Sequence, residues 1–137
     1  MSYRLIDHTA DLGLHVFGAD PQTLFENAAL ALFDQITDLQ KVKGIHEKKL
    51  TVQGIDWPDL MVCWLRELLF LWEARALLVK KAKIFSISAQ HVSAILSADS
   101  FIPGRHEIFK EIKAVTYHQI QAHQGPQGWE AKIIFDI

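Results

Sequence analysis

The sequence predicts an α+β domain of two layers, in which two helices cover one face of a mostly antiparallel sheet. Three observations lead to this prediction. Two long segments repeat apolar residues at helical spacing, several short segments alternate apolar and polar residues as strands do, and the last four of these can pair as hairpins. The 137 residues contain no internal repeat, low-complexity tract or linker, so we expect residues 1–137 to form a single domain.

The composition excludes several classes of protein. Hydrophobic residues make up 50% of the chain and charged residues 22%, which is typical of a packed core and not of a disordered chain. A formal net charge of −2 provides no overall attraction to nucleic acid or to anionic lipid. The N-terminus lacks a signal-peptide pattern, and charged residues interrupt the apolar runs short of a membrane span. We therefore expect a cytoplasmic protein without membrane contact.

The first strand is expected at residues 12–17, directly after Asp11. Leu12, Leu14 and Val16 recur at every second position there, so one face of this strand is buried.

A helix is expected at residues 21–37. Asp20 can cap it, and Pro21 fits its first turn, where a missing N–H costs nothing. Its apolar residues form one stripe that can pack on a sheet: Leu24, Phe25, Ala28, Ala29, Leu32, Phe33 and Ile36.

A second strand is expected at residues 49–55, with Leu50 and Val52 facing inward. Four lysines lie in or near it: Lys41, Lys43, Lys48 and Lys49. A nucleic-acid patch is one interpretation, but lysines that protect a solvated strand edge are the favoured one.

The second helix is expected at residues 59–78, after a start signal that ends at Pro58, and it is apolar on most of its circumference. Cys63 is interpreted as a core thiol, since buried cysteine usually behaves as a small hydrophobe. Glu67 has two interpretations. It belongs to a narrow solvated stripe, which the pattern favours, or it points into a polar site.

The remaining chain is expected to form four strands. The predicted ranges are 84–88, 91–98, a long strand at 111–121, and 129–137, with a loop over 99–109 and a turn over 124–128.

Polar residues at the two ends of the chain suggest a cation site. Asp136 and the α-carboxylate of Ile137 supply oxygens at the end of the last strand, and Asp11 and Asp7 supply more if the first and last strands are neighbours. Oxygen ligands suit a hard divalent cation. On spacing alone, the favoured alternative is that Asp11 caps a turn and Asp136 is solvated.

Other chemistry has little support. The seven histidines show no zinc-ligand spacing with a cysteine partner, and no nucleotide-cradling loop or common hydrolase motif is present. Lys113, Tyr117 and His118 lie on an otherwise apolar segment, where strand-edge residues are commoner than catalysts.

Five segments are distinctive as a set, in chain order DHTADLGLHVFG, LFENAALALF, WLRELLFLWE, RHEIFKEIKAVTYHQI and the terminal IIFDI. Together they resemble the archease family, and the resemblance covers nearly the whole chain. The segments DHTAD and EIKAVTYH and the terminal Asp-hydrophobic pair are specific as a set. One segment departs from the family pattern. Before the Arg-His pair, residues 98–104 have no Gly-Glu and no acidic-Pro sequence.

The resemblance implies an accessory protein and not an enzyme. Archeases assist the tRNA-splicing RNA ligase that joins 2′,3′-cyclic-phosphate or 3′-phosphate ends to 5′-hydroxyl ends. In the family, the factor promotes GTP- and metal-dependent guanylylation of the ligase and supports multiple turnover. The resemblance therefore implies that this protein is a cofactor of the ligase and that it contacts RNA only indirectly.

The resemblance also implies a bound divalent metal ion, Ca²⁺ in the family, with Mg²⁺ or Mn²⁺ as alternatives. The metal ligands it implies are Asp11, Asp136 and Ile137, which reverses the interpretation favoured by spacing. Lys113 matches a lysine that the family keeps, and His8, Glu67 and His118 are further candidates for the activator function.

Two alternatives remain open. The same oxygens, with Lys113 as phosphate clamp and His118 as general acid, could serve a small metal-dependent phosphoester hydrolase. A chaperone-like interaction module that uses the loop at residues 99–106 is the third hypothesis.

Overall fold

The computed structural model describes residues 2–6 and 11–137. Two long helices and eight strands make up most of them. In chain order these are β1 (Tyr3–Ile6), β2 (Asp11–Gly18), α1 (Pro21–Ile36), a 3-10 turn (Leu39–Lys41), β3 (His46–Gln53), α2 (Trp57–Arg75), β4 (Leu77–Ser88), β5 (His91–Ser100), β6 (Ala114–Val115), β7 (Gln121–Gly125) and β8 (Gly128–Asp136).

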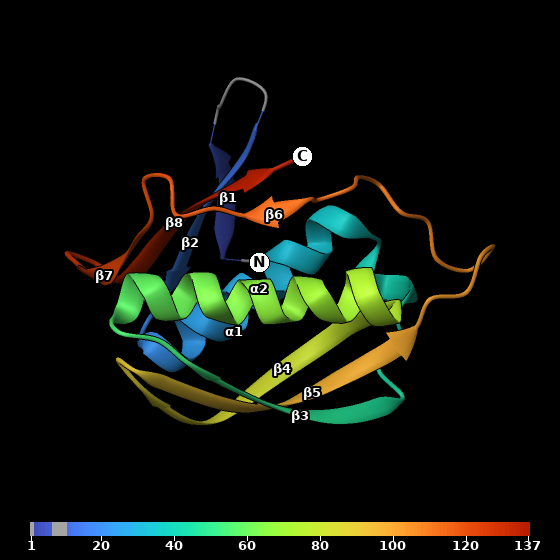
Figure 1. The fold of residues 1–137 in the computed structure, drawn as a ribbon, viewed down its shortest axis with the longest axis horizontal. Coiled ribbons are helices and arrows are strands. Elements are labelled where there is room, and N and C mark those ends of the chain that lie inside the picture. The colour runs from blue at the N-terminus through green and yellow to red at the C-terminus, as the bar shows by residue number, and fades with distance from the viewer. Residues whose placement is uncertain (1, 7–10) are drawn as a thin grey trace.

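The strands form two separate sheets with the helices between them (Figure 1). The five-stranded sheet has the order β1-β2-β8-β6, with β7 also paired to β8, and the three-stranded sheet has the order β3-β5-β4. Every pairing among these strands is antiparallel. The predicted α+β class, with two helices and antiparallel strands, is confirmed. The prediction had one sheet, whereas the structure has two, each covered on one face by the shared helix layer.

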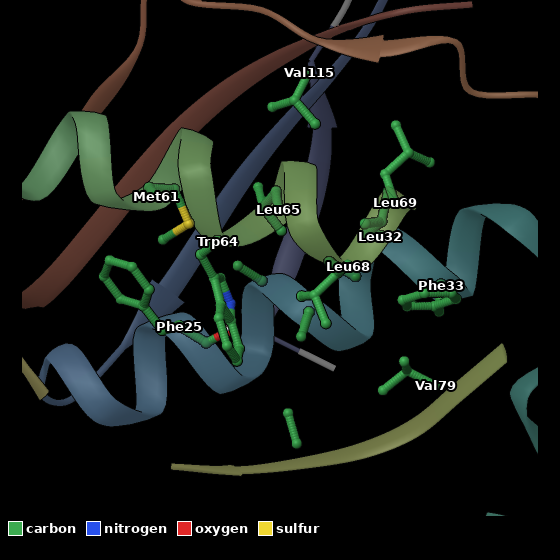
Figure 2. Close-up of a cluster of buried hydrophobic side chains, with 14 of the residues drawn as sticks. Phe25, Leu32, Phe33, Met61, Trp64, Leu65, Leu68, Leu69, Val79 and Val115 are labelled. Carbon is green, nitrogen blue, oxygen red and sulfur yellow. The ribbon is translucent and has the colours of Figure 1, made fainter. Parts of the chain in front are cut away.

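The helix layer is the core of the molecule. All seven residues of the predicted apolar stripe of α1 are at most 1% exposed. On α2, Trp64 is fully buried, and its indole N–H donates to the Phe25 carbonyl of α1 at 2.9 Å. Figure 2 shows Val115 of the five-stranded sheet on one side of these helices and Val79 of the three-stranded sheet on the other. The helices are apolar on two sides because each must pack against two sheets.

Both helix starts form as the sequence predicts. The Asp20 carboxylate accepts from the Thr23 N–H, and the Asp56 carboxylate accepts from the Asp59 N–H. Each satisfies a backbone donor that the first helical turn leaves unpaired. No helix in the described part of the chain combines the length and the apolar character of a membrane span.

The end of the second helix corrects one prediction. The helix stops at Arg75, not at residue 78, because Ala76 takes a left-handed conformation with φ 53°. Leu77 and Leu78 then begin β4, which is longer than the predicted 84–88 strand. Short apolar runs fit a helix and a strand equally well, and here the reversal at Ala76 decides between them.

The long strand predicted at 111–121 is wrong. The chain pairs with β8 only at Ala114–Val115, leaves it, and rejoins it as β7 at Gln121. In the interruption, the Thr116 N–H and hydroxyl both donate to the Ile134 carbonyl, and Gln119 has φ 53°. The alternation of the sequence continues through this excursion, so periodicity does not reveal it.

The expected loop at 99–109 is partly strand and partly buried. Asp99 belongs to β5, and its side chain is 1% exposed beside His106, which is 4% exposed. The His106 Nε2 lies 3.3 Å from the Asp99 carboxylate, and the Lys43 N–H donates to that carboxylate at 3.0 Å. The tip of the segment, from Ile102 to Gly104, is exposed, as are Ser100, Glu107 and Phe109. The divergent stretch at 98–104 therefore begins with a fixed structural anchor.

Candidate functional site

Asp11 and Asp136 lie directly opposite each other at one end of the five-stranded sheet. The β2–β8 register pairs Asp11 with Asp136 and Leu12 with Phe135. Leu12 and Phe135 face the core, so alternation turns both aspartates to the opposite face of the sheet. Opposed residues of an antiparallel pair have Cα atoms about 4.5–5.5 Å apart. The structure therefore brings together two carboxylates that are 125 positions apart in the numbering of the sequence.

Lys113 adjoins this pair through the backbone. Its N–H donates to the Asp136 carbonyl at 2.8 Å, and the next residue, Ala114, is the register partner of Asp136. Three chain segments, the start of β2, the end of β8 and the start of β6, thus meet at one place. In Figure 1 the C-terminus lies beside β6 at this end of the sheet.

Lys113 also lines a shallow surface pocket of about 580 Å³ at the end of α2. The other lining residues are Trp72, Glu73, Ala76, Glu111 and Ile112. Desolvation and the neighbouring Glu111 carboxylate both raise the pKa of Glu73. Two acidic side chains and one lysine therefore line this pocket.

A side-chain clamp from α2 holds β6 in place. The Arg66 Nε donates to the Val115 carbonyl at 3.2 Å, and its guanidinium lies 4.7 Å from the centre of the Tyr117 ring. The Tyr117 hydroxyl donates to the Asp59 carboxylate at 2.5 Å. This hydrogen bond raises the pKa of Tyr117 to about 12 and lowers that of Asp59, which also accepts from the Ile55 N–H.

Sequence reasoning missed this clamp. The available signal was the seven-residue spacing of Asp59 and Arg66, which puts both on one face of a helix. Nothing in the sequence indicated that Tyr117 would reach that face, because the predicted long strand kept it on the sheet.

The remaining candidates that the structure describes lie on different segments of the chain. Ile137 follows Asp136 and is 46% exposed. His118 is exposed in the segment between β6 and β7. Its backbone N–H donates to the Thr116 hydroxyl at 3.2 Å. Glu67 is exposed on α2, so its apolar neighbours do not enclose it. His8 and Asp7 lie outside the described residues.

Cys63 does not have the environment of an activated nucleophile. Its thiol is partly buried, and its sulfur lies 3.8 Å from the Asp59 carboxylate. Burial and this negative charge raise the pKa of Cys63, whereas reactive thiols have lowered pKa values.

The donor set at the sheet end fits a hard cation in its chemistry. Two carboxylates at opposed positions repel each other unless a positive charge neutralises them, and carboxylate and carbonyl oxygens are the ligands that Ca²⁺ and Mg²⁺ prefer. Among residues 2–6 and 11–137, no group of three or more His, Cys, Asp or Glu side chains has the arrangement of a metal site. A complete coordination shell at Asp11 and Asp136 would therefore need oxygens beyond these side chains.

The fold and the site together define a class of protein. This is a small α+β domain with two helices between two antiparallel sheets and two opposed aspartates at the end of one sheet. A sequence model described as the archease protein family (MTH1598/TM1083) matches residues 3–137. The chain belongs to the archease family.

Curated relatives and solved structures agree with this assignment. The chain is 35% identical to protein archease of Methanosarcina mazei, over 98% of this chain and 95% of that protein, and 31% identical to that of Methanopyrus kandleri, over the full length of both. Its structure resembles the solution structure of protein 1598 of Methanobacterium thermoautotrophicum, with a TM-score of 0.84, 30% identity and 99% of both chains covered. A Thermotoga maritima crystal structure described as an archease and possible chaperone shares the fold, with a TM-score of 0.63, 19% identity and coverage of 98% and 96%.

Proposed function

We propose that this protein is an accessory factor that activates the GTP-dependent RNA ligase of tRNA splicing. It promotes guanylylation of the ligase and its multiple turnover, and it does so through a divalent cation held at the acidic end of the five-stranded sheet. Family membership supports the choice of partner, and the resemblance of the DHTAD and EIKAVTYH segments supports the role of this end of the molecule.

The observation that carries the proposal is the register of β2 and β8. It sets Asp11 opposite Asp136, although the sequence alone favoured separate roles for them. The two carboxylates, with oxygens of Ile137, would hold the cation, which is Ca²⁺ by family resemblance and would add a positive charge that can bind phosphate oxygens. Lys113, whose backbone is hydrogen-bonded to Asp136, is positioned to add a second positive charge at the same end.

The arrangement suits a protein partner. Asp136 is exposed at the end of the sheet, so the acidic pair can be presented to another protein's active site. The pocket that Lys113 lines is shallow. The clamp from Arg66 to Val115 fixes β6 and so limits the movement of Lys113 relative to Asp136.

The test is RNA ligation by the partner ligase under multiple-turnover conditions, with GTP and a divalent metal. We expect the wild-type protein to raise ligase guanylylation and turnover, and the variants Asp11→Asn and Asp136→Asn to lose this stimulation. Asparagine keeps the size of the side chain and the backbone hydrogen bond of Asp136. The matched control is Glu107→Gln, which neutralises an exposed acid in another part of the structure.

Stimulation by both variants at the wild-type level would contradict the proposed site. Absence of stimulation by the wild-type protein would contradict the proposed function. In that case the alternative of a metal-dependent phosphoester hydrolase, with Lys113 and His118 at the same acids, is tested directly by phosphoester turnover with added divalent metals.

A further inference from the structure

The three-stranded sheet leaves one face uncovered. Its inner face packs on the helices, with Val92, Ala94 and Leu96 of the central strand fully buried. In Figure 1 this sheet is the bottom layer, and no other element lies beneath it. Because side chains alternate along a strand, the residues between these buried positions project from the uncovered face.

The residues that project there are mostly basic or hydroxyl-bearing. One row across the three strands is Lys49, Ile95 and Lys83, and the next rows are Glu47, Ser97 and Lys81 on one side and Thr51, Ser93 and Ser86 on the other. Neighbouring side chains bury Ser93 to 5% exposure, and its hydroxyl is hydrogen-bonded to Thr51 and His91. The face carries three lysines, Lys49, Lys81 and Lys83, against one acid, Glu47. The other two lysines of these strands are not on it, since Lys48 is the register partner of the inward-facing Leu96 and the Lys80 ammonium donates to the Leu39 carbonyl. The face is therefore basic in a chain whose net charge is −2.

An aromatic ring lies across this basic face. Phe85 is 56% exposed at a β-bulge of β4, and the Lys49 Nζ of β3 is 5.6 Å from the centre of its ring. β5 separates β3 from β4, so the two side chains can meet only over the outer face of the central strand. The bulge thus turns a large apolar side chain onto a solvated face.

Protection of the sheet edges explains only part of this pattern. β3 and β4 are both edge strands, and lysines discourage pairing with other chains. Edge protection does not require an exposed phenylalanine beside the lysines, and an exposed apolar ring on an edge strand works against it. The combination of cations, hydroxyls and one exposed ring is the composition of a surface that binds a polyanion with exposed bases.

We propose that the outer face of the three-stranded sheet binds single-stranded RNA. Lys49, Lys81 and Lys83 contact phosphates, and Phe85 stacks on a base. Only an unpaired strand exposes base faces to a ring on a flat sheet, whereas duplex RNA presents phosphates and shallow base edges. The choice of RNA over single-stranded DNA rests on the proposed function. The inference adds a direct RNA contact to a protein for which only an indirect one was predicted.

The test is fluorescence anisotropy with a labelled single-stranded oligouridylate of about 12 nucleotides, a length within the roughly 4–16 nucleotides that one OB fold binds. We expect Phe85→Ala to weaken binding by about tenfold, the equivalent of one stacked base. We expect Lys49→Gln with Lys83→Gln to weaken it by at least about tenfold at low salt. The slope of log affinity against log salt should fall by about 0.7 for each lost phosphate contact.

The control double variant is Arg75→Gln with Lys110→Gln, which removes the same charge from residues outside this sheet and should bind like the wild-type protein. Equal weakening by this control, or full affinity of Phe85→Ala, would overturn the proposal. The proposal would also be overturned if the lysine variants aggregate while their monomeric fraction binds RNA with wild-type affinity. That result would show that the lysines only protect the sheet edges. Single-stranded DNA of the same length and a duplex RNA serve as competitors, and equal competition by the duplex would also overturn it.

This assay contains no ligase, GTP or divalent metal. Failure of RNA binding therefore leaves the activator function testable by ligation, and failure of ligase stimulation leaves the RNA-binding face standing.

Discussion

The two sheets share one helix layer but differ in charge and in the state of their outer faces. The strands of the five-stranded sheet carry two cations against three acids, and two of these acids are the opposed Asp11 and Asp136. On its outer face, His15 and Ile134 are 8% and 4% exposed, and Ser93 on the outer face of the three-stranded sheet is 5% exposed. The three-stranded sheet is basic, and Lys81, Lys83 and Phe85 are exposed on its outer face.

This difference shows which parts of the molecule packing constrains. The inner faces of both sheets must be apolar because they cover the same helices, so they carry no specific chemistry. The outer faces and sheet ends are free of that demand, and each has its own charge. We propose that the end of the five-stranded sheet holds a cation and that the outer face of the three-stranded sheet binds a polyanion. The following predictions separate these two activities.

The largest effect should come from the shared layer. Trp64→Ala removes a fully buried side chain and its hydrogen bond to the Phe25 carbonyl. We expect the free energy of unfolding to fall by about 3–5 kcal/mol, measured by urea denaturation, since large-to-small core changes leave a cavity. Both proposed binding activities should decline together. A loss below about 1 kcal/mol would contradict the central role of this layer.

A divalent cation should stabilise the protein by binding at the end of the five-stranded sheet, without affecting the three-stranded sheet. If Asp11 and Asp136 bind Ca²⁺, then Ca²⁺ at about 100 times its dissociation constant should raise the free energy of unfolding by about 2.7 kcal/mol. Thermal unfolding with and without Ca²⁺ measures this. Asp136→Asn should abolish the stabilisation and leave RNA binding unchanged. An equal gain in Asp136→Asn would place the Ca²⁺ effect elsewhere.

The buried Asp99 should stabilise the three-stranded sheet, and its contribution to the free energy of unfolding should depend on pH. Burial alone would raise the pKa of Asp99, but the Lys43 N–H and the nearby Arg105 and His106 outweigh it and hold the pKa below its usual value. The folded state therefore binds this proton less tightly than the unfolded state. Its contribution is full above the ordinary aspartate pKa of about 3.9 and is lost as pH falls below that value.

Asp99→Asn should accordingly cost about 1–3 kcal/mol at pH 7, because it removes a buried charge-assisted contact with His106. The difference from wild type should shrink as the pH falls towards 3, as measured by urea denaturation at both values. A difference that stays constant with pH would show that the lost contact is not the ionised one.

The smallest effect concerns the clamp on β6. Tyr117→Phe removes the hydrogen bond to Asp59 at a half-exposed position, so we expect a loss of stability below about 1 kcal/mol. The clearer readout is ultraviolet titration of the phenols. Tyr3 and Tyr117 are the two tyrosines of the chain, and both have a pKa raised to about 12.

The native protein should thus form little tyrosinate near pH 10, and any stability from these hydrogen bonds should be lost between about pH 10 and 12. Tyr117→Phe should halve the amplitude of the native titration. A native titration centred near pH 10, as in the unfolded chain, would contradict both hydrogen bonds.

Much of the fold was predictable from local signals. The cap at Asp20, the proline after it and the apolar stripe that follows gave α1 nearly to the residue, and Leu12, Leu14 and Val16 are buried as expected. The hairpin of β4 and β5 also formed as predicted, although β4 is longer. These features depend on residues that are close in sequence, so their pattern is readable there.

Strand β1 and the division of the strands into two sheets were not predicted. β1 is four residues long and pairs along one edge of β2, with Tyr3 bonded to Asp34 of α1. A segment this short shows no period, and its pairing depends on a partner elsewhere in the chain. Which strands share a sheet likewise depends on contacts that the sequence pattern does not encode.

For the candidate sites too, some features were readable from the sequence and others only from the structure. The sequence by itself determined that acids stand at the start of β2 and the end of β8, and that lysines concentrate in β3 and β4. Only the tertiary structure decided that Asp11 faces Asp136, that Lys113 is bonded to it, and that Phe85 and Lys49 meet over β5. Residue types and local periodicity lie in the sequence, whereas neighbours far apart along the chain are set by which strands pair and in which register.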